Sequence, residues 1–202
     1  MNPLSVLLNK IFDYTGGLVM RALLAILVFA VISGCALTAP NYSASVENAQ
    51  MLRDSGINKA RVGKFQADPK TANNEAISLR GSSMASPVGG KFTEYLEDAI
   101  RSELNIARIF DDKSTIEIGG VLIQNDVSVG SISEGTGIME ARITVKRDSQ
   151  IRFDKTKSVT ITFESSFAGA VAIPRGVQAY PNLVQKFLSA LYADKEFIAA
   201  LK

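Results

Sequence analysis

Cys35 is the only thiol of this 202-residue sequence, and the chain contains no histidine that could activate a cysteine or serine nucleophile. Without an imidazole there is no histidine general base, no Ser-His or Cys-His dyad and no histidine metal site. A lone thiol also excludes an internal disulfide and a CxxC zinc or redox motif. We therefore predict a protein that is not an enzyme and has neither a metal site nor a cofactor.

The residues before Cys35 indicate covalent modification of its thiol. Residues 22–32 form an apolar run that is shorter than the ~20 residues of a membrane-spanning helix but typical of a signal-peptide core, and Arg21 precedes it. The tetrapeptide ISGC that ends at Cys35 resembles the lipobox of bacterial lipoproteins. This resemblance implies cleavage between Gly34 and Cys35, a diacylglycerol on the thiol and a fatty acid such as palmitate on the new amino group. A buried helix with an incidental cysteine is the disfavoured alternative.

The signal divides the chain into three predicted parts. Residues 1–34 are the signal peptide, with translation starting at Met1 or at Met20. Residues 35–58 are mostly small and polar without a sustained period, and we predict that they form a lipidated, flexible tether. Residues 59–202 form the predicted periplasmic domain.

The residue after the cysteine bears on location. In lipoproteins of diderm bacteria, an aspartate at that position marks retention in the inner membrane, and this chain has Ala36 there. The resemblance therefore implies an outer-membrane protein that faces the periplasm and touches the membrane through its lipid. The net charge of +2 provides no strong field for nucleic acid, so we predict no nucleic-acid partner.

Apolar periodicity over residues 59–202 predicts short strands and two amphipathic helices. Helices are expected from Phe92 to Leu104, after a Ser86-Pro87 start signal, and from Val177 or Pro181 to Ala193, followed by a short turn capped by Asp194. Strands are expected over 60–67, 76–80, 115–124, 137–147 and 159–167, with a turn at 154–157. This order predicts an α+β fold, a two-layer sandwich with a mainly antiparallel sheet and both helices on one face.

The first predicted helix has distinct faces. Leu96, Ile100 and Leu104 recur at spacings of four residues, so they should face the sheet. Glu97 and Glu103 lie between them in sequence, and we predict that both face water.

Residues 125–137 contain three glycines and three serines between two predicted strands, and we interpret them as a flexible hairpin tip. Binding residues often lie on such tips, so Asn125, Asp126, Ser131 and Glu134 are the candidate partner-binding residues. A phosphate- or glycan-binding loop is the alternative. The segment lacks the lysine and spacing of a P-loop, and no helix follows it.

Several segments of the predicted domain share a pattern with a known family. They are EDAIRSEL, IEIGGVLI and the C-terminal FAGAVAIP and YPNLVQKFLSALYADKEFIAAL. Together with the lipobox they resemble the YajG-type lipoproteins over roughly residues 60–201. The resemblance implies an exported outer-membrane lipoprotein with this fold and without an assigned enzymatic activity, and it transfers no active-site residues.

Two binding functions remain open. The first is an accessory subunit that docks on an envelope protein or transport machine. The second is a lipid- or glycan-binding module that uses a cleft between helix and sheet. A solid core with a sizeable exposed apolar patch would favour the first, and an apolar cavity between the layers would favour the second.

Overall fold

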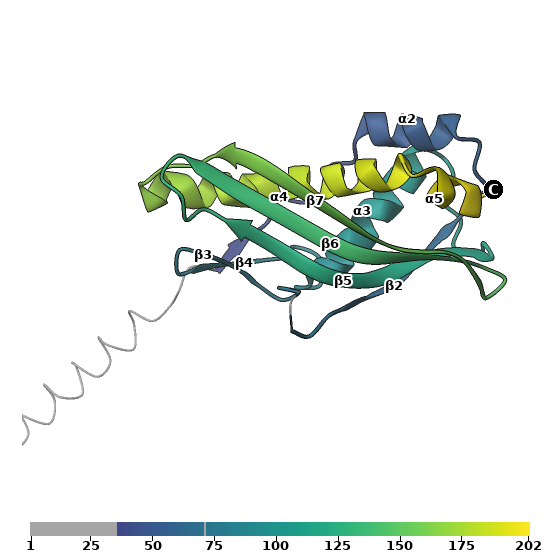
Figure 1. The fold of residues 1–202 in the computed structure, drawn as a ribbon, viewed down its shortest axis with the longest axis horizontal. Coiled ribbons are helices and arrows are strands. Elements are labelled where there is room, and N and C mark those ends of the chain that lie inside the picture. The colour runs from purple at the N-terminus through teal and green to yellow at the C-terminus, as the bar shows by residue number, and fades with distance from the viewer. Residues whose placement is uncertain (1–35, 71) are drawn as a thin grey trace, which may run out of the picture. The chain divides into compact units, whose positions relative to one another are not determined.

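The computed structural model describes residues 36–70 and 72–202, so the predicted signal peptide and Cys35 lie outside the described residues. Its main sheet has four strands in the order β2-β5-β6-β7 (Figure 1). These strands are β2 (Arg61–Ala67), β5 (Ile116–Ser128), β6 (Glu134–Arg147) and β7 (Gln150–Glu164). β2 runs parallel to β5, whereas β5, β6 and β7 are antiparallel, so the sheet is mainly antiparallel.

Two long helices, α3 (Phe92–Ile106) and α4 (Gly169–Tyr192), cover one face of this sheet (Figure 1). α3 packs against β2, and α4 packs against β6 and β7. Alternate residues of β6 are buried, namely Met139, Ala141, Ile143 and Val145. The predicted two-layer α+β sandwich, with two amphipathic helices on one face of a mainly antiparallel sheet, is confirmed.

α4 begins at Gly169, well before the predicted start at Val177 or Pro181, and it contains both Pro174 and Pro181. An internal proline removes a helix hydrogen bond and costs ~3 kcal/mol. Burial of the helix against the sheet, with Tyr180 fully enclosed, offsets that cost. The predicted start at Val177 or Pro181 is therefore too late, because the helix continues upstream through both prolines.

The β6–β7 connection is a tight turn at Asp148 and Ser149, whose φ angles are 49° and 66°. Left-handed backbone at both central positions has a twist that matches the flanking strands. The predicted turn at 154–157 is therefore wrong, because those residues lie inside β7. The predicted cap at Asp194 is confirmed, since its carboxylate accepts from the backbone N–H groups of Glu196 and Phe197 in the first turn of α5 (Lys195–Ala200).

The N-terminal residues 36–58 belong to the folded domain, so the predicted flexible tether over 35–58 is wrong for this segment. β1 (Ala36–Thr38) pairs with β4, and α2 (Val46–Asp54) packs against α3 and α4. Leu52 of α2 is fully buried. The compact unit thus begins at residue 36 and not at residue 59.

β1 belongs to a second, three-stranded sheet in the order β1-β4-β3. β3 (Ile77–Leu79) and β4 (Ser82–Ala85) are antiparallel, and β1 is parallel to β4. Arg80 and Gly81 form the β3–β4 turn with φ angles of 48° and 84°. The predicted strands at 60–67 and 76–80 therefore exist, but they lie in different sheets.

α3 begins at Phe92 and not at the predicted Ser86-Pro87 signal. The Ser86 hydroxyl instead closes a local turn with the backbone of Val88. The first two N–H groups of α3 donate to the backbone oxygen and the side-chain oxygen of Asn74, at 2.7 and 2.9 Å. Asn74, a loop residue outside the helix, thus accepts hydrogen bonds from the free N–H groups at the helix start, where Ser86 was expected to act as the cap.

The faces of α3 are only partly as predicted. Leu96, Ile100 and Leu104 are fully buried in the core, which confirms the apolar stripe. Glu97 and Glu103, expected in water, are also buried. Glu97 Oε1 accepts a hydrogen bond from the backbone N–H of Phe65 in β2, at 2.8 Å. Glu103 accepts hydrogen bonds from residues of the N-terminal segment, among them Asn48. α3 is therefore covered on its sheet side and also beside α2.

Candidate functional site

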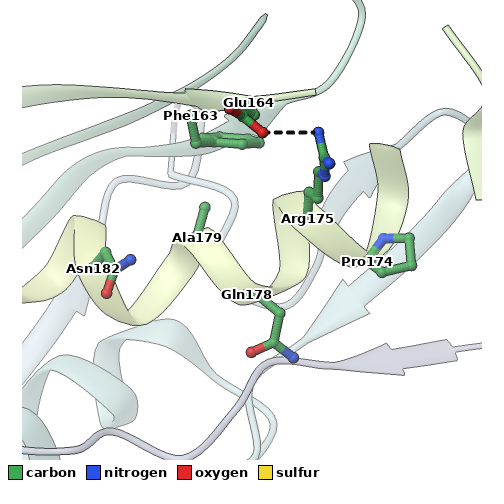
Figure 2. A pocket seen from close by; sticks show the side chains of 7 residues that line it. All are labelled: Phe163, Glu164, Pro174, Arg175, Gln178, Ala179 and Asn182. Carbon is green, nitrogen blue, oxygen red and sulfur yellow. Dashed lines mark ion pairs between the residues drawn. The ribbon is translucent and has the colours of Figure 1, made fainter. Parts of the chain in front are cut away.

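An apolar cleft lies between the C-terminal half of β7 and α4 (Figure 2). Its volume is about 360 Å³. Two residues of β7 and five of α4 line it: Phe163, Glu164, Pro174, Arg175, Gln178, Ala179 and Asn182. Figure 2 shows the Phe163 ring on the strand side and the small side chain of Ala179 directed toward it. The cleft thus presents an aromatic surface beside an alanine and two amide side chains.

A weak ion pair spans one end of the cleft. Arg175 Nη1 lies 3.5 Å from Glu164 Oε2, and the same nitrogen donates to the backbone oxygen of Ser165 at 3.2 Å (Figure 2). Both charged side chains are exposed, so the pair contributes about 0–1 kcal/mol. Glu134 lies opposite Glu164 in the β6–β7 register, so acidic groups outnumber Arg175 here. Breaking the Arg175–Glu164 ion pair to open this end of the cleft therefore costs little free energy.

β7 has an open edge beside the cleft, because among the described strands it pairs only with β6. Its first half is fastened to the C-terminal region by ion pairs of Lys155 with Glu196, at 2.5 Å, and of Lys157 with Asp194. The hydrogen bond from Lys157 lowers the pKa of Asp194. The second half runs past the cleft, where an unpaired edge offers N–H and C=O groups to an added strand.

The β5–β6 hairpin tip, residues 129–133, lies beside the first half of α4. A Cβ at Gly176 would lie only 2.8 Å from Val129 Cγ1, so glycine lets the helix approach the tip this closely. Arg80, at the β3–β4 turn, donates to the backbone oxygen of Ser131 at 3.0 Å. The helix and the small sheet together position the tip.

The four predicted binding residues do not form one exposed loop. Ser131 and Glu134 are exposed at or next to the tip, as predicted. Asn125 and Asp126 lie inside β5, and Asn125 is fully buried, so its prediction as a tip residue is wrong. Its Oδ1 accepts from the Tyr180 hydroxyl at 3.1 Å, which joins β5 to α4. The prediction failed because β5 continues further than its apolar pattern.

Glu103 is a buried carboxyl that binds the N-terminal segment. Its Oε1 accepts from the Tyr42 hydroxyl at 2.5 Å and from Ser45 N and Asn48 Nδ2, each at 3.1 Å. Burial raises the pKa of Glu103, and these hydrogen bonds oppose part of that rise. Burial and the nearby Glu103 also raise the pKa of Tyr42. A shifted pKa can mark a functional site, but this carboxyl is 0% exposed and fastens α2 to α3. We assign it a structural role.

Residues 36–70 and 72–202 contain no group of three or more His, Cys, Asp or Glu side chains arranged to hold a metal ion. In the same part of the chain, no helix combines the length and the apolar character needed to cross a membrane. The cleft offers an aromatic ring, amide groups and an exposed guanidinium. These groups suit the binding of an apolar group that has polar neighbours.

Comparisons with known proteins give a fold and no family. No protein-family model matches the sequence, and no curated protein matches it. Solved structures do match, among them protein XCC0632 of Xanthomonas campestris, of the DUF330 family. That match has a TM-score of 0.54 at 11% identity and covers 81% of this chain and 96% of the other. At this identity the likeness shows a shared fold, which spans nearly the whole Xanthomonas protein.

A second match, from Caulobacter crescentus CB15, is described as a candidate lipoprotein. It has a TM-score of 0.39 at 10% identity and covers 77% of this chain and 96% of the other. A likeness this low carries no argument about function. The YajG-type resemblance stays a prediction.

The α4 side of the cleft is absent from the predicted site. Arg175 and Gln178 precede or barely enter the helix that was expected from Val177 or Pro181. A usable signal exists in the sequence, because the small or apolar residues Ala172, Gly176, Tyr180 and Leu183 follow spacings of four, four and three residues, and all four are buried. This helical period extends the predicted helix upstream through both prolines.

Proposed function

We propose that this chain is an envelope lipoprotein, attached to a membrane through lipid on Cys35, that acts by binding and not by catalysis. The lipobox-like ISGC supports lipidation, and the folded domain begins at Ala36, directly after the modified cysteine. Ala36 also favours the outer membrane, facing the periplasm, in a diderm host. A domain held at a membrane in this way suits an accessory subunit of an envelope assembly or transport system.

The partner that we propose is an extended segment of another envelope protein. The observation that carries this proposal is the apolar cleft beside the open edge of β7. A segment added as the next strand would bond its backbone to β7 and direct alternate side chains toward the α4 layer. Phe163 and Ala179 offer an apolar surface to one such side chain, and Gln178 and Asn182 offer hydrogen bonds at its rim.

Crosslinking in intact cells tests this site. A photoreactive amino acid replaces Gln178 in the full-length chain, and the same replacement at Gln150, exposed at the β6–β7 turn, is the matched control. We expect an envelope protein to crosslink at position 178 and not at 150, with the adduct located in an extended segment of that partner. Arg175→Glu should weaken the crosslink, because it adds a third acidic group beside Glu134 and Glu164.

Two results would contradict the proposal. Crosslinks of equal strength at both positions would mean that the cleft has no preference for the partner. A crosslink at 178 that Arg175→Glu leaves unchanged would mean that the partner does not enter the cleft. Arg175 is exposed, so the variant should fold, and a urea melt checks this.

A lipid or glycan in the same cleft is the second candidate function, and the apolar lining favours the lipid. The volume of about 360 Å³ lies near the lower end of the ~300–1,000 Å³ found for ligand pockets. Such a ligand needs no strand edge. Native mass spectrometry of the protein extracted from cells would then show a bound small molecule, lost in Ala179→Arg, without a protein crosslink at position 178.

A further inference from the structure

Three large apolar side chains are left exposed at one end of the domain. Ile132 is 73% exposed, Phe167 is 78% exposed and Val171 is 42% exposed. They belong to the hairpin tip, the loop between β7 and α4, and the first turn of α4. The other large apolar side chains exposed in the described part of the chain lie singly on α2, α3 and β7. We call these three residues the apolar end.

Backbone contacts hold the apolar end together. Arg80 donates to the backbone oxygen of Phe167 at 2.6 Å and to that of Ser131 at 3.0 Å. The backbone N–H of Ser165 donates to Ser133 at 2.8 Å, on the other side of Ile132. The tip and the loop before α4 are therefore fastened side by side, and their apolar side chains form one patch.

The described chain begins at this same end. Ala36 pairs with Ser83 in the small sheet, and Ser83 follows Arg80 by three residues, a span of about 10 Å at most. Figure 1 shows β1, the β3–β4 turn and the hairpin tip at the same end of the domain. Cys35 immediately precedes Ala36 in the sequence, so no residue separates a lipid on Cys35 from β1, which lies at this end of the domain.

We infer that the apolar end inserts into the lipid surface that holds the anchor. This inference rests on the proposed lipidation of Cys35. Apolar side chains at such interfaces lie about 5–10 Å into the boundary between headgroups and acyl chains. Arg80, Arg175, Glu134 and Glu164 surround the patch with both signs of charge, so the contact depends on apolar insertion and not on the charge of the lipid. A lipid anchor and a second contact together fix the orientation of the domain on the membrane.

Tryptophan fluorescence tests the contact, because the natural chain contains no tryptophan. Phe167→Trp places one fluorophore at the apolar end, and Ile151→Trp places one at the 58% exposed position next to the β6–β7 turn, at the opposite end of β7. The full-length chain is expressed, processed in cells and reconstituted into vesicles of phosphatidylethanolamine and phosphatidylglycerol. A second set of vesicles carries bromine on the acyl chains, which quenches tryptophan on contact.

We expect the emission of the tryptophan at 167 to shift to shorter wavelength in vesicles and to fall with brominated lipid. The tryptophan at 151 should show the emission of an aqueous residue and no quenching. Ile132→Ser with Val171→Ser should reduce the quenching at 167, because these changes remove the neighbouring apolar contacts.

Two outcomes would overturn the inference. Equal quenching at 167 and 151 would mean that the domain has no preferred orientation. A tryptophan at 167 that is unquenched, whether its emission is shifted or not, would mean that water or protein covers the patch. Palmitate labelling of the same preparations separates the two proposals, since unlabelled protein refutes the anchor and labelled but unquenched protein refutes the lipid contact alone.

Discussion

Replacing Glu103 by glutamine should change how the stability of the domain depends on pH. Burial raises the pKa of Glu103 above the value of about 4.3 of an unfolded glutamate. The folded protein therefore binds this proton more tightly than the unfolded chain does. The contribution to stability is fully present below the unfolded pKa and is lost as pH rises through the raised folded pKa. Glutamine has no such proton and retains an oxygen for the Tyr42, Ser45 and Asn48 donors.

Glu103→Ala removes the hydrogen-bond acceptor together with the charge, so its difference from Glu103→Gln isolates the hydrogen bonds. This variant leaves the donors of Tyr42, Ser45 and Asn48 without their acceptor. An unsatisfied buried donor costs about 1–3 kcal/mol, and loss of the side chain leaves a cavity. Because Tyr42 is only partly buried, water satisfies part of this demand. We expect the free energy of unfolding to fall by about 3 kcal/mol near pH 4, and the deficit to shrink as pH rises, because alanine also lacks the proton whose contribution the natural protein loses.

Urea unfolding of residues 36–202 between about pH 4 and pH 7 measures both effects. The quantity to compare is the difference in free energy of unfolding between variant and natural protein at each pH. Hydrogen bonds from Arg142 and Lys157 lower the pKa values of Asp154 and Asp194, which adds an opposite pH dependence to both proteins. Glu103→Gln should gain stability relative to the natural protein as pH rises. A constant difference, or one that moves the other way, would refute the burial of this carboxyl.

Three further substitutions test other parts of the structure. Glu97→Ala should lower the free energy of unfolding by about 1–3 kcal/mol, because a backbone N–H of β2 loses its acceptor, while Asn105→Ala on the exposed side of α3 should change it by under ~0.5 kcal/mol. Asn125→Ala should cost about 1–3 kcal/mol in a urea melt by orphaning the Tyr180 hydroxyl, and Tyr180→Phe in that background should add little. Cys35→Ser should abolish palmitate labelling and leave the precursor uncut; label in this variant would refute lipidation there.

The elements that sequence predicted well are those whose burial follows one regular period. β6 alternates from Glu134 to Lys146, and α3 carries an apolar stripe of helical period that is fully buried. In both, the solvent-facing and core-facing positions are set by the geometry of the element itself. The number of such elements and their order were enough to predict the fold class, although the ends of β7 and α4 were misplaced.

The N-terminal segment and the polar contacts of α3 could not be predicted in this way. A helical period assigns Glu103 to water, because a charged residue lies there unless another element covers it. The covering element, α2, is only nine residues long and meets α3 partly through Asn48, so its own apolar pattern is weak. The candidate cleft was missed for a related reason. Its α4 side lies largely in the upstream half of that helix. Local sequence rules do not predict a helix that continues through two prolines.

If Cys35 carries the proposed lipid, the contacts of Glu103 also govern how far the domain can lie from the membrane surface. These contacts fasten α2 to the domain. Without them, residues 36–57 would be held only by β1, which is too short at three residues to keep the segment in place. If α2 were released, this segment would become a flexible linker with an end-to-end distance of about 25 Å, enough to lift the apolar end off the lipid. Glu103→Ala should therefore weaken bromine quenching of the tryptophan at position 167, although Glu103 does not belong to the apolar end. Glu103→Gln, which keeps the acceptor oxygen, should preserve the quenching. Equal quenching in both variants would mean that β1 and the apolar end hold the domain to the lipid without α2.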